Sequence, residues 1–262
     1  MNLYGKTVLL TGASKGLGRT LATQLDAKGC RLLLVARDTA RLDSLQKELH
    51  TPGSRQLPCD LGDGHSRARL IEQIFEAETR IDLVIHCAGI GSHSKVSQLT
   101  AAEIQMVLAV NTIAPLELTA ELLPLLPSGE PAGIVTIGSV AGELTLPGMS
   151  LYSASKAALH TFSRSAGIEM ANEGHFSLLV ILGALRDTHF GESIRNPANK
   201  QPGLYRRLDV YPERAAAQII KAVEQQHSLC VIPGWYRLLL GFNRVFFPLA
   251  QLATRHLYRQ FR

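Results

Sequence analysis

The decisive stretch of this chain reads Thr7-Val8-Leu9-Leu10-Thr11-Gly12-Ala13-Ser14-Lys15-Gly16-Leu17-Gly18. Its first part is apolar and partly β-branched, which is typical of a buried strand. A helical pattern follows the glycines, because Leu17, Leu21 and Leu25 recur at intervals of four. A strand, a glycine-rich turn and a helix in this order predict a dinucleotide-binding loop, since the first N–H groups of the helix are free to bind phosphate.

Each glycine of the turn has a mechanical reason. Gly12 permits the tight turn, Gly16 lets the backbone approach a pyrophosphate, and Gly18 allows helix and strand to pack closely. The alternative is an ordinary strand-to-helix turn whose glycines are in left-handed conformations. The cofactor-binding residues that we predict here are Gly12, Ser14, Lys15, Gly16, Leu17 and Gly18.

A second pattern, Tyr152-Ser153-Ala154-Ser155-Lys156, opens a stretch with helical character. Four residues are just over one helical turn, so Tyr152 and Lys156 share a face. A phenol has a pKa near ~10, and a neighbouring cation is expected to lower this pKa by favouring the phenolate. The pair is therefore predicted to be a tuned proton donor. The spacing alone equally suits a contact between two side chains on a surface helix.

Short apolar strands alternate with helical stretches along the rest of the chain. This alternation predicts an α/β fold with a single doubly wound, Rossmann-type parallel sheet and helices on both faces. Ligands of such sheets bind beyond the carboxyl ends of the strands. The dinucleotide-binding domain is expected over 1–232, with 233–262 as its C-terminal extension. We expect strands at 7–11, 31–36, 54–58, 81–86, 132–138, 176–182 and 228–232, and the clearest helices at 16–28, 100–123, 150–172 and 212–226.

The motifs Thr-Gly-x-x-x-Gly-x-Gly at 11–18 and Tyr-x-x-x-Lys at 152–156 resemble those of the short-chain dehydrogenase/reductase family. The resemblance covers nearly the whole chain and implies a nicotinamide-dependent oxidoreductase that interconverts a carbonyl and an alcohol. Position by position, it implies that Ser139, Tyr152 and Lys156 are catalytic and that Asn111 helps to hold a water and the lysine. It also implies cofactor contacts at Asp60, Leu61, Ala88, Gly89, Tyr152, Lys156, Gly183 and Thr188.

The chain departs from the family pattern at two places. His86 and Cys87 stand where the family usually has two asparagines, a change that affects the positioning of the cofactor more than the chemistry. His86 is expected to be a packed structural histidine. Leu182 stands where proline usually precedes Gly183, so a rigid turn is lost and a looser nicotinamide pocket or lid is expected.

The end of the second expected strand favours NADP. In an NAD site, an acidic side chain at this place binds the ribose 2′-hydroxyl, whereas this chain has the small Ala36. Arg37 and Lys15 supply the positive charge that a 2′-phosphate needs. We therefore predict NADPH rather than NADH. The alternative is that Arg37 is a solvated charge and that Asp38 takes the acidic role.

The composition suits a cytoplasmic enzyme of one domain, with 262 residues of which 46% are hydrophobic. Four cysteines without a C-x-x-C pair are expected to be free thiols in a reducing compartment, and no signal peptide is expected. The nine histidines do not cluster at metal-ligand spacing, so no metal is expected. The net charge of +5 does not indicate nucleic acid, because no aromatic-interleaved basic stripe accompanies it.

Residues 184–211 are expected to form a lid over the substrate pocket. The basic residues of this lid, such as Arg186 and Lys200, either meet an anionic substrate or are solvated charges.

The extension 233–262 is amphipathic, with apolar residues such as Trp235 and Phe242 on one helical face and arginines on the other. Pro248 is expected to bend or break it, and the arginines make it a poor membrane span. Three alternatives stay open. The apolar face closes over the pocket or a partner subunit, lies on an anionic membrane surface, or completes the core.

The sequence therefore predicts an NADPH-dependent oxidoreductase of small molecules in which Tyr152 donates the proton. A membrane-bound extension would favour a hydrophobic ketone or acyl derivative as substrate. The alternative is a cofactor-binding regulatory or scaffold protein on the same fold, which has no chemical need for Ser139, Tyr152 and Lys156 together. The family resemblance implies a homodimer or homotetramer.

Overall fold

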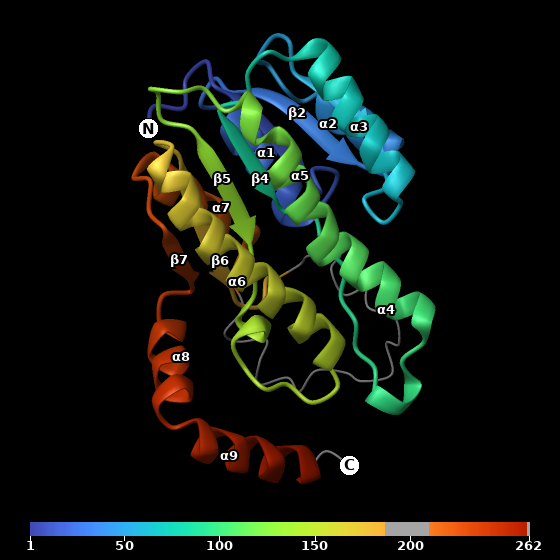
Figure 1. The fold of residues 1–262 in the computed structure, drawn as a ribbon, viewed down its shortest axis with the longest axis vertical. Coiled ribbons are helices and arrows are strands. Elements are labelled where there is room, and N and C mark those ends of the chain that lie inside the picture. Colours follow the sequence, from blue (N-terminus) through green and yellow to red (C-terminus); the bar gives the residue numbers. More distant parts are fainter. Residues whose placement is uncertain (187–209, 261–262) are drawn as a thin grey trace.

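The computed structural model of the protein describes residues 1–186 and 210–260. Seven strands, all paired in parallel, form one sheet in the order β3-β2-β1-β4-β5-β6-β7 (Figure 1). The expected doubly wound sheet is confirmed, and the largest difference in a strand boundary is at β4, which begins at Leu83 instead of 81. The strands are β1 Thr7–Thr11, β2 Arg31–Ala36, β3 Arg55–Pro58, β4 Leu83–His86, β5 Gly133–Ile137, β6 Phe176–Leu182 and β7 Leu229–Ile232.

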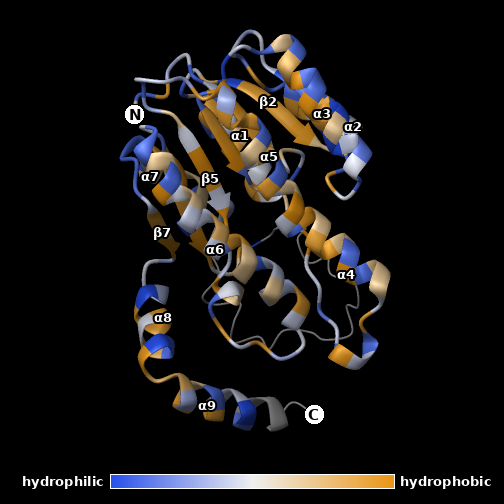
Figure 2. Ribbon diagram, in the orientation of Figure 1, coloured by the Kyte–Doolittle hydropathy of each residue, from blue (hydrophilic) through white to orange (hydrophobic). Residues whose placement is uncertain are grey.

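Helices cover both faces of the sheet, as expected (Figure 1). One face packs against α1 and α7, and the other packs against α3 and α5. The apolar strands therefore lie between two layers of helices (Figure 2). The helices up to the last strand are α1 Gly16–Asp26, α2 Thr39–Gln46, α3 Gly64–Ala77, α4 Ala101–Leu108, α5 Ala114–Leu122, α6 Ser150–Asn172 and α7 Pro212–Glu224.

The side chains of β1 show why the central strands carry apolar residues on both of their faces. Val8 and Leu10 belong to the core cluster under α1 and α7, whereas Leu9 belongs to the cluster under α3 and α5. Successive side chains of a strand point to opposite faces, and a parallel sheet with two covered faces has no solvent side. The carboxyl ends of β1, β4 and β5 consequently meet at one edge of the sheet, where the site is expected.

The helix expected at 100–123 is divided by a π-helical turn, Ala109–Ile113, between α4 and α5. The segment Ala101–Leu125 is long and apolar enough to cross a membrane by length and composition, with half of its most apolar window buried. Ala114, Leu118 and Leu122 pack into the core cluster with α3, so packing within the domain accounts for the apolar character of this segment.

The C-terminal extension forms two helices, α8 Tyr236–Val245 and α9 Phe247–Gln260. They separate at Phe246, one residue before the first turn of α9, which contains Pro248. Proline is tolerated in a first turn because its missing N–H would have no helical partner there. The predicted break at this proline is confirmed. The inner side of α8 contributes to the core through Leu240, which clusters with Ile181 and Val231. Of the three roles considered for the extension, completion of the core therefore applies to Leu240.

Candidate active site

Three glycines shape the turn between β1 and α1. Gly12 and Gly16 have φ angles of +72° and +53°, in the left-handed region that other residues rarely adopt. A Cβ atom on Gly12 would lie 2.8 Å from the Cα of Ala88, and one on Gly18 would lie 2.1 Å from the carbonyl oxygen of Gly12. Lys15, the N-cap residue of α1, makes no side-chain capping bond. This tight backbone cradle with uncapped N–H groups fits a dinucleotide pyrophosphate.

Thr11 holds the end of β4 against the glycine turn. Its hydroxyl accepts hydrogen bonds from the backbone N–H groups of Cys87 and Ala88, at 3.1 and 3.2 Å. The predicted cofactor residues Ala88 and Gly89 thereby lie beside the predicted glycine loop.

Ser139, Tyr152 and Lys156 converge at the carboxyl end of β5. Ser139 follows that strand, and the other two lie in the first turns of α6, where both are buried. The hydroxyls of Ser139 and Tyr152 share a hydrogen bond. The Nζ of Lys156 lies 6.0 Å from the ring centroid of Tyr152 and donates a hydrogen bond of 2.9 Å to the carbonyl oxygen of Ile137. The structure therefore brings the three predicted residues together.

Burial, and not the lysine, determines the pKa of Tyr152. Loss of water raises this pKa to about 12, and the hydrogen bond with Ser139 only partly opposes the rise. Burial also lowers the pKa of Lys156 to about 8. The expectation that Lys156 lowers the pKa of Tyr152 is wrong in this structure, because the ammonium is bound to Ile137 and desolvation of the phenol prevails. The phenol is consequently protonated at neutral pH.

The π turn places Asn111 under the site, where its side chain is fully buried. Its amide oxygen accepts from the N–H of Ile90 at 2.9 Å, and its amide nitrogen donates to the carbonyl of Ile90 and to the Oγ of Ser155, at 2.9 and 3.0 Å. A Cβ on Gly89 would lie 3.5 Å from both Asn111 Oδ1 and Lys156 Nζ. Asn111 thus fixes the loop after β4 to α6, beside the lysine.

His86 and Cys87 are packed inside the domain. The Nε2 of His86 lies 3.0 Å from the hydroxyl of Thr119 on α5, and burial lowers the histidine pKa to about 3, so the ring is neutral. Burial raises the pKa of Cys87 to about 12. The geometry agrees with the structural role expected for His86. Within residues 1–186 and 210–260, no three His, Cys, Asp or Glu side chains gather as a metal site.

The rim next to β2 carries the charges that bear on cofactor choice. Arg37 has 60% of its side chain exposed, and its guanidinium lies 3.8 Å from the carboxylate of Asp60. Asp38 caps α2, because its carboxylate accepts from the N–H of Arg41 at 3.0 Å and pairs with that guanidinium at 3.3 Å. The carboxylate of Asp38, the alternative acidic residue for the ribose 2′-hydroxyl, is therefore already engaged at the start of α2. Arg37, in contrast, extends into solvent.

Sequence reasoning missed His160, which lies one turn after Lys156 on α6. Its ring is buried, and Nε2 accepts a 3.1 Å hydrogen bond from the backbone N–H of Ser139. A Cβ on Gly138 or Gly142 would come within 2.2 or 2.7 Å of ring atoms. The two glycines around Ser139 therefore make room for this ring, and they were the only signal in the sequence.

Glu143 extends this contact to the C-terminal helices. Because Nε2 of His160 accepts a bond, Nδ1 carries the proton and donates it to the Glu143 carboxylate at 3.2 Å. The same carboxylate pairs with Arg164 and, at 3.0 Å, with Arg244 of α8. The hydrogen bond from His160, followed by those from the arginines, lowers the pKa of Glu143 to about 2. Asn243 of α8 also donates to the Glu143 backbone carbonyl at 3.0 Å.

Gly183, at the carboxyl end of β6, is packed against α8. Its N–H donates to the carbonyl of Ile232 at 2.7 Å, and a Cβ would lie 2.4 Å from the ring of Tyr236. The segment expected to receive the nicotinamide therefore begins beside the C-terminal extension. Thr188 and most of the expected lid lie outside the described residues.

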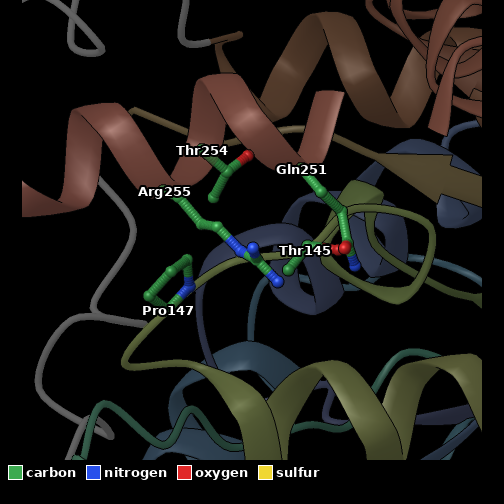
Figure 3. Close-up of a pocket in the computed structure, with 5 residues that line it drawn as sticks. All are labelled: Thr145, Pro147, Gln251, Thr254 and Arg255. Carbon is green, nitrogen blue, oxygen red and sulfur yellow. The ribbon is translucent and has the colours of Figure 1, made fainter. Parts of the chain in front are cut away.

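A cavity of about 250 Å³ lies between α9 and the loop that leads from Ser139 to α6 (Figure 3). Thr145 and Pro147 line it from the loop, and Gln251, Thr254 and Arg255 line it from α9. None of the predicted catalytic residues is among these five, so the cavity adjoins the loop of the catalytic serine and is separate from the reacting groups.

The comparisons with known proteins agree with this geometry. The family model described as short chain dehydrogenase matches residues 6–199. The chain therefore belongs to the short-chain dehydrogenase/reductase family, whose members are oxidoreductases. A curated relative, the ketoacyl reductase HetN of a Nostoc species, is 30% identical over 232 residues, which cover 88% of this chain and 79% of that protein.

Solved structures of the family are also similar. A short-chain dehydrogenase from Sphingobium yanoikuyae in complex with NADPH is 26% identical, with a TM-score of 0.76 and coverage of 93% of this chain and 95% of that one. A Burkholderia phymatum enzyme in complex with NAD has a TM-score of 0.81 at 21% identity, with coverage of 95% and 96%. This second likeness shows the fold alone. Together with the family membership, the NADPH complex at 26% identity supports a nicotinamide dinucleotide as cofactor, without establishing a preference for NADP over NAD.

Proposed function

We propose that this protein interconverts a carbonyl and an alcohol with NADPH as cofactor. The observation that carries the proposal is the convergence of Ser139, Tyr152 and Lys156 at the carboxyl end of β5, with Gly89 beside the lysine. A regulatory protein on the same fold has no chemical need for these three groups in one place. The glycine turn with its uncapped helix would hold the pyrophosphate.

In the direction of reduction, Tyr152 holds the proton. A pKa of about 12 keeps the phenol protonated at neutral pH, so it can donate a hydrogen bond to the carbonyl oxygen and then release its proton to the developing alkoxide. The hydroxyl of Ser139 orients the same oxygen. The ammonium of Lys156, which donates to the carbonyl oxygen of Ile137, would contact the bound cofactor, as the family resemblance implies. A bound nicotinamide supplies the hydride.

Replacing Tyr152 by phenylalanine tests the proposal. The change keeps the buried ring and removes the proton donor, so we expect kcat to fall about 10²- to 10³-fold while NADPH binding, followed by cofactor fluorescence, is retained. Tyr4→Phe, at a tyrosine with 78% exposure, is the matched control and should leave kcat unchanged. If Tyr152→Phe still reduced carbonyl substrates at a rate close to that of the unaltered protein, the role of the phenol would be refuted. Tight NADPH binding by the unaltered protein without turnover of any carbonyl would favour the regulatory alternative.

The preference for NADPH is proposed from the charges beside β2. Arg37 is exposed, Ala36 is small, and Asp38 is engaged in capping α2. A charged hydrogen bond to a 2′-phosphate contributes about 1.5–3 kcal/mol, so Arg37→Gln should weaken NADPH binding by about 10- to 100-fold and leave NADH binding nearly unchanged. Arg69→Gln, on the exposed side of α3, is the control. Equal losses for both cofactors would contradict the proposal.

We propose a hydrophobic ketone or an acyl derivative as substrate, which the relative named as a ketoacyl reductase supports. Absorbance of NADPH over a panel of simple ketones, aldehydes and β-ketoacyl thioesters tests this class, and turnover confined to small polar aldehydes would contradict it. The homodimer or homotetramer and the cytoplasmic location stay predictions.

A further inference from the structure

The helices α8 and α9 carry an unusual share of exposed apolar surface. Nine of the seventeen large hydrophobic side chains exposed among the described residues lie between 235 and 252. Leu238 and Val245 are 81% and 72% exposed. Scattered apolar residues are normal on a protein surface, but a concentration of this kind is typical of a surface that contacts another protein or a membrane.

These side chains form a continuous stripe. Leu238, Phe242 and Val245 recur at intervals of four and three, so they share one face of α8. The opposite face is the one that packs on the domain, through Leu240 and Asn243. The rings of Phe242 and Phe246 are 5.0 Å apart, and they continue the stripe toward Leu249 and Leu252 of α9, both of which are exposed. We call residues 235–256 with this stripe the apolar tail.

The charge around the stripe has a single sign. After Glu224, the sequence contains five arginines and no aspartate or glutamate as far as Arg262. Arg237 is exposed on α8, whereas Arg244 pairs with Glu143 and Arg255 lines the cavity between α9 and the domain. A second copy of this chain would bring like charges together on the same surface, whereas an anionic phospholipid surface complements both the arginines and the apolar stripe.

The dimensions of the helices favour a position along the surface. α8 has 10 residues and α9 has 14, with a break between them, whereas a helix needs about 20 apolar residues to span the bilayer. We propose that the apolar tail binds the surface of membranes that contain anionic phospholipid, with α8 and α9 lying in the interface. This inference does not depend on the proposed enzymatic function.

Binding of α8 and α9 to a membrane would bring the cavity beside α9 close to the lipid. The cavity beside Pro147 has the inner side of α9 as one wall, through Gln251 and Thr254 (Figure 3). α8 is also bound to Glu143, whose carboxylate accepts from His160. The apolar tail therefore connects the proposed lipid surface to the loop of Ser139.

Sedimentation of the full chain with vesicles tests the proposal. We expect the protein to bind vesicles of phosphatidylcholine mixed with phosphatidylglycerol, and to bind phosphatidylcholine alone much more weakly. Leu238→Asp combined with Phe242→Asp should lower partition onto the mixed vesicles by about 100-fold or more. Arg237→Gln should lower it by about fivefold.

The control is Phe75→Asp, which alters an exposed apolar residue of α3 far from α9 (Figure 1) and should leave partition unchanged. Circular dichroism establishes that each variant is folded. Absence of binding to the mixed vesicles, or equal binding by the Leu238→Asp, Phe242→Asp variant, would overturn the proposal. Concentration-dependent self-association that this variant abolishes, without vesicle binding by the unaltered chain, would assign the stripe to a second copy and would also overturn it.

Discussion

Replacing Gly138 by alanine tests the packing that joins the catalytic loop to α6. The added Cβ would lie 2.2 Å from Nε2 of His160 and 3.1 Å from the carbonyl oxygen of Val180. The first distance is too short to persist, so the imidazole has to move. The N–H of Ser139, which donates to this nitrogen at 3.1 Å, then loses its acceptor.

The expected cost follows from two effects. Overpacking in a well-packed interior costs about 1–3 kcal/mol, and a buried N–H without a partner costs about 1–3 kcal/mol. We therefore expect Gly138→Ala to lower the free energy of unfolding by about 2–6 kcal/mol. We also expect a lower kcat, because Ser139 is the next residue.

A double-mutant cycle in urea unfolding isolates the contact. The cycle compares the unaltered protein, Gly138→Ala, His160→Ala and the double variant. Since His160→Ala removes the ring that the new methyl group would strike, the double variant should be at least about 1 kcal/mol more stable than the sum of the single effects predicts. Additive losses would refute the reasoning.

Three further predictions concern charge and glycine packing. Glu143 has a folded-state pKa of about 2 against an ordinary value of 4.5, so its contribution to stability is present above pH 4.5 and is lost as pH falls toward 2. Glu143→Gln should accordingly destabilise the protein by at most about 3 kcal/mol at pH 7, and the difference in urea unfolding should narrow below pH 4.5. Gly18→Ala should weaken cofactor binding more than 10-fold in a fluorescence titration, because its Cβ would lie 2.1 Å from the Gly12 carbonyl oxygen. Gly241→Ala, in α8 with no atom within 4 Å of the added Cβ, should raise the free energy of unfolding by about 0.5–1 kcal/mol.

Each of these has an outcome that contradicts it. A Glu143→Gln effect that is constant between pH 7 and the acid range would mean that the ion pairs with Arg164 and Arg244 do not stabilise the fold. Unchanged cofactor binding in Gly18→Ala would show that the turn relaxes at little cost. A destabilised Gly241→Ala variant would show that the exposed side of α8 is covered by another surface.

The sheet could be predicted because both of its faces are buried. Strands such as Leu229–Ile232 are apolar throughout and lie between polar or glycine-containing segments, so their positions are visible without knowledge of the packing. The convergence of Ser139, Tyr152 and Lys156 followed from the family resemblance, because the motifs occur at fixed points of a known topology. The division of the long helix at Ala109–Ile113 was not predicted, although Pro115 in the first turn of α5 marks the place, because it has no N–H to donate to the carbonyl four residues earlier.

Other features of the site depend on packing that spacing does not reveal. The pKa of Tyr152 is raised because the phenol is buried, whereas the spacing of four to Lys156 suggested the opposite direction. The contact of His160 with Ser139 joins residues 21 positions apart and becomes visible only when α6 lies against β5. For the apolar tail, the amphipathic pattern was clear, but the pattern alone does not tell what covers its outer side.

The π turn limits which insertions and deletions the segment from α4 to α5 can accept during evolution. Losing one residue from Ala109–Ile113 would restore an ordinary helix and rotate α4 by about 100° relative to α5. The amide of Asn111 would then leave Ile90 or Ser155 without its hydrogen bond. Relatives that keep this asparagine should therefore tolerate insertions and deletions in the surface loops but none within this helix.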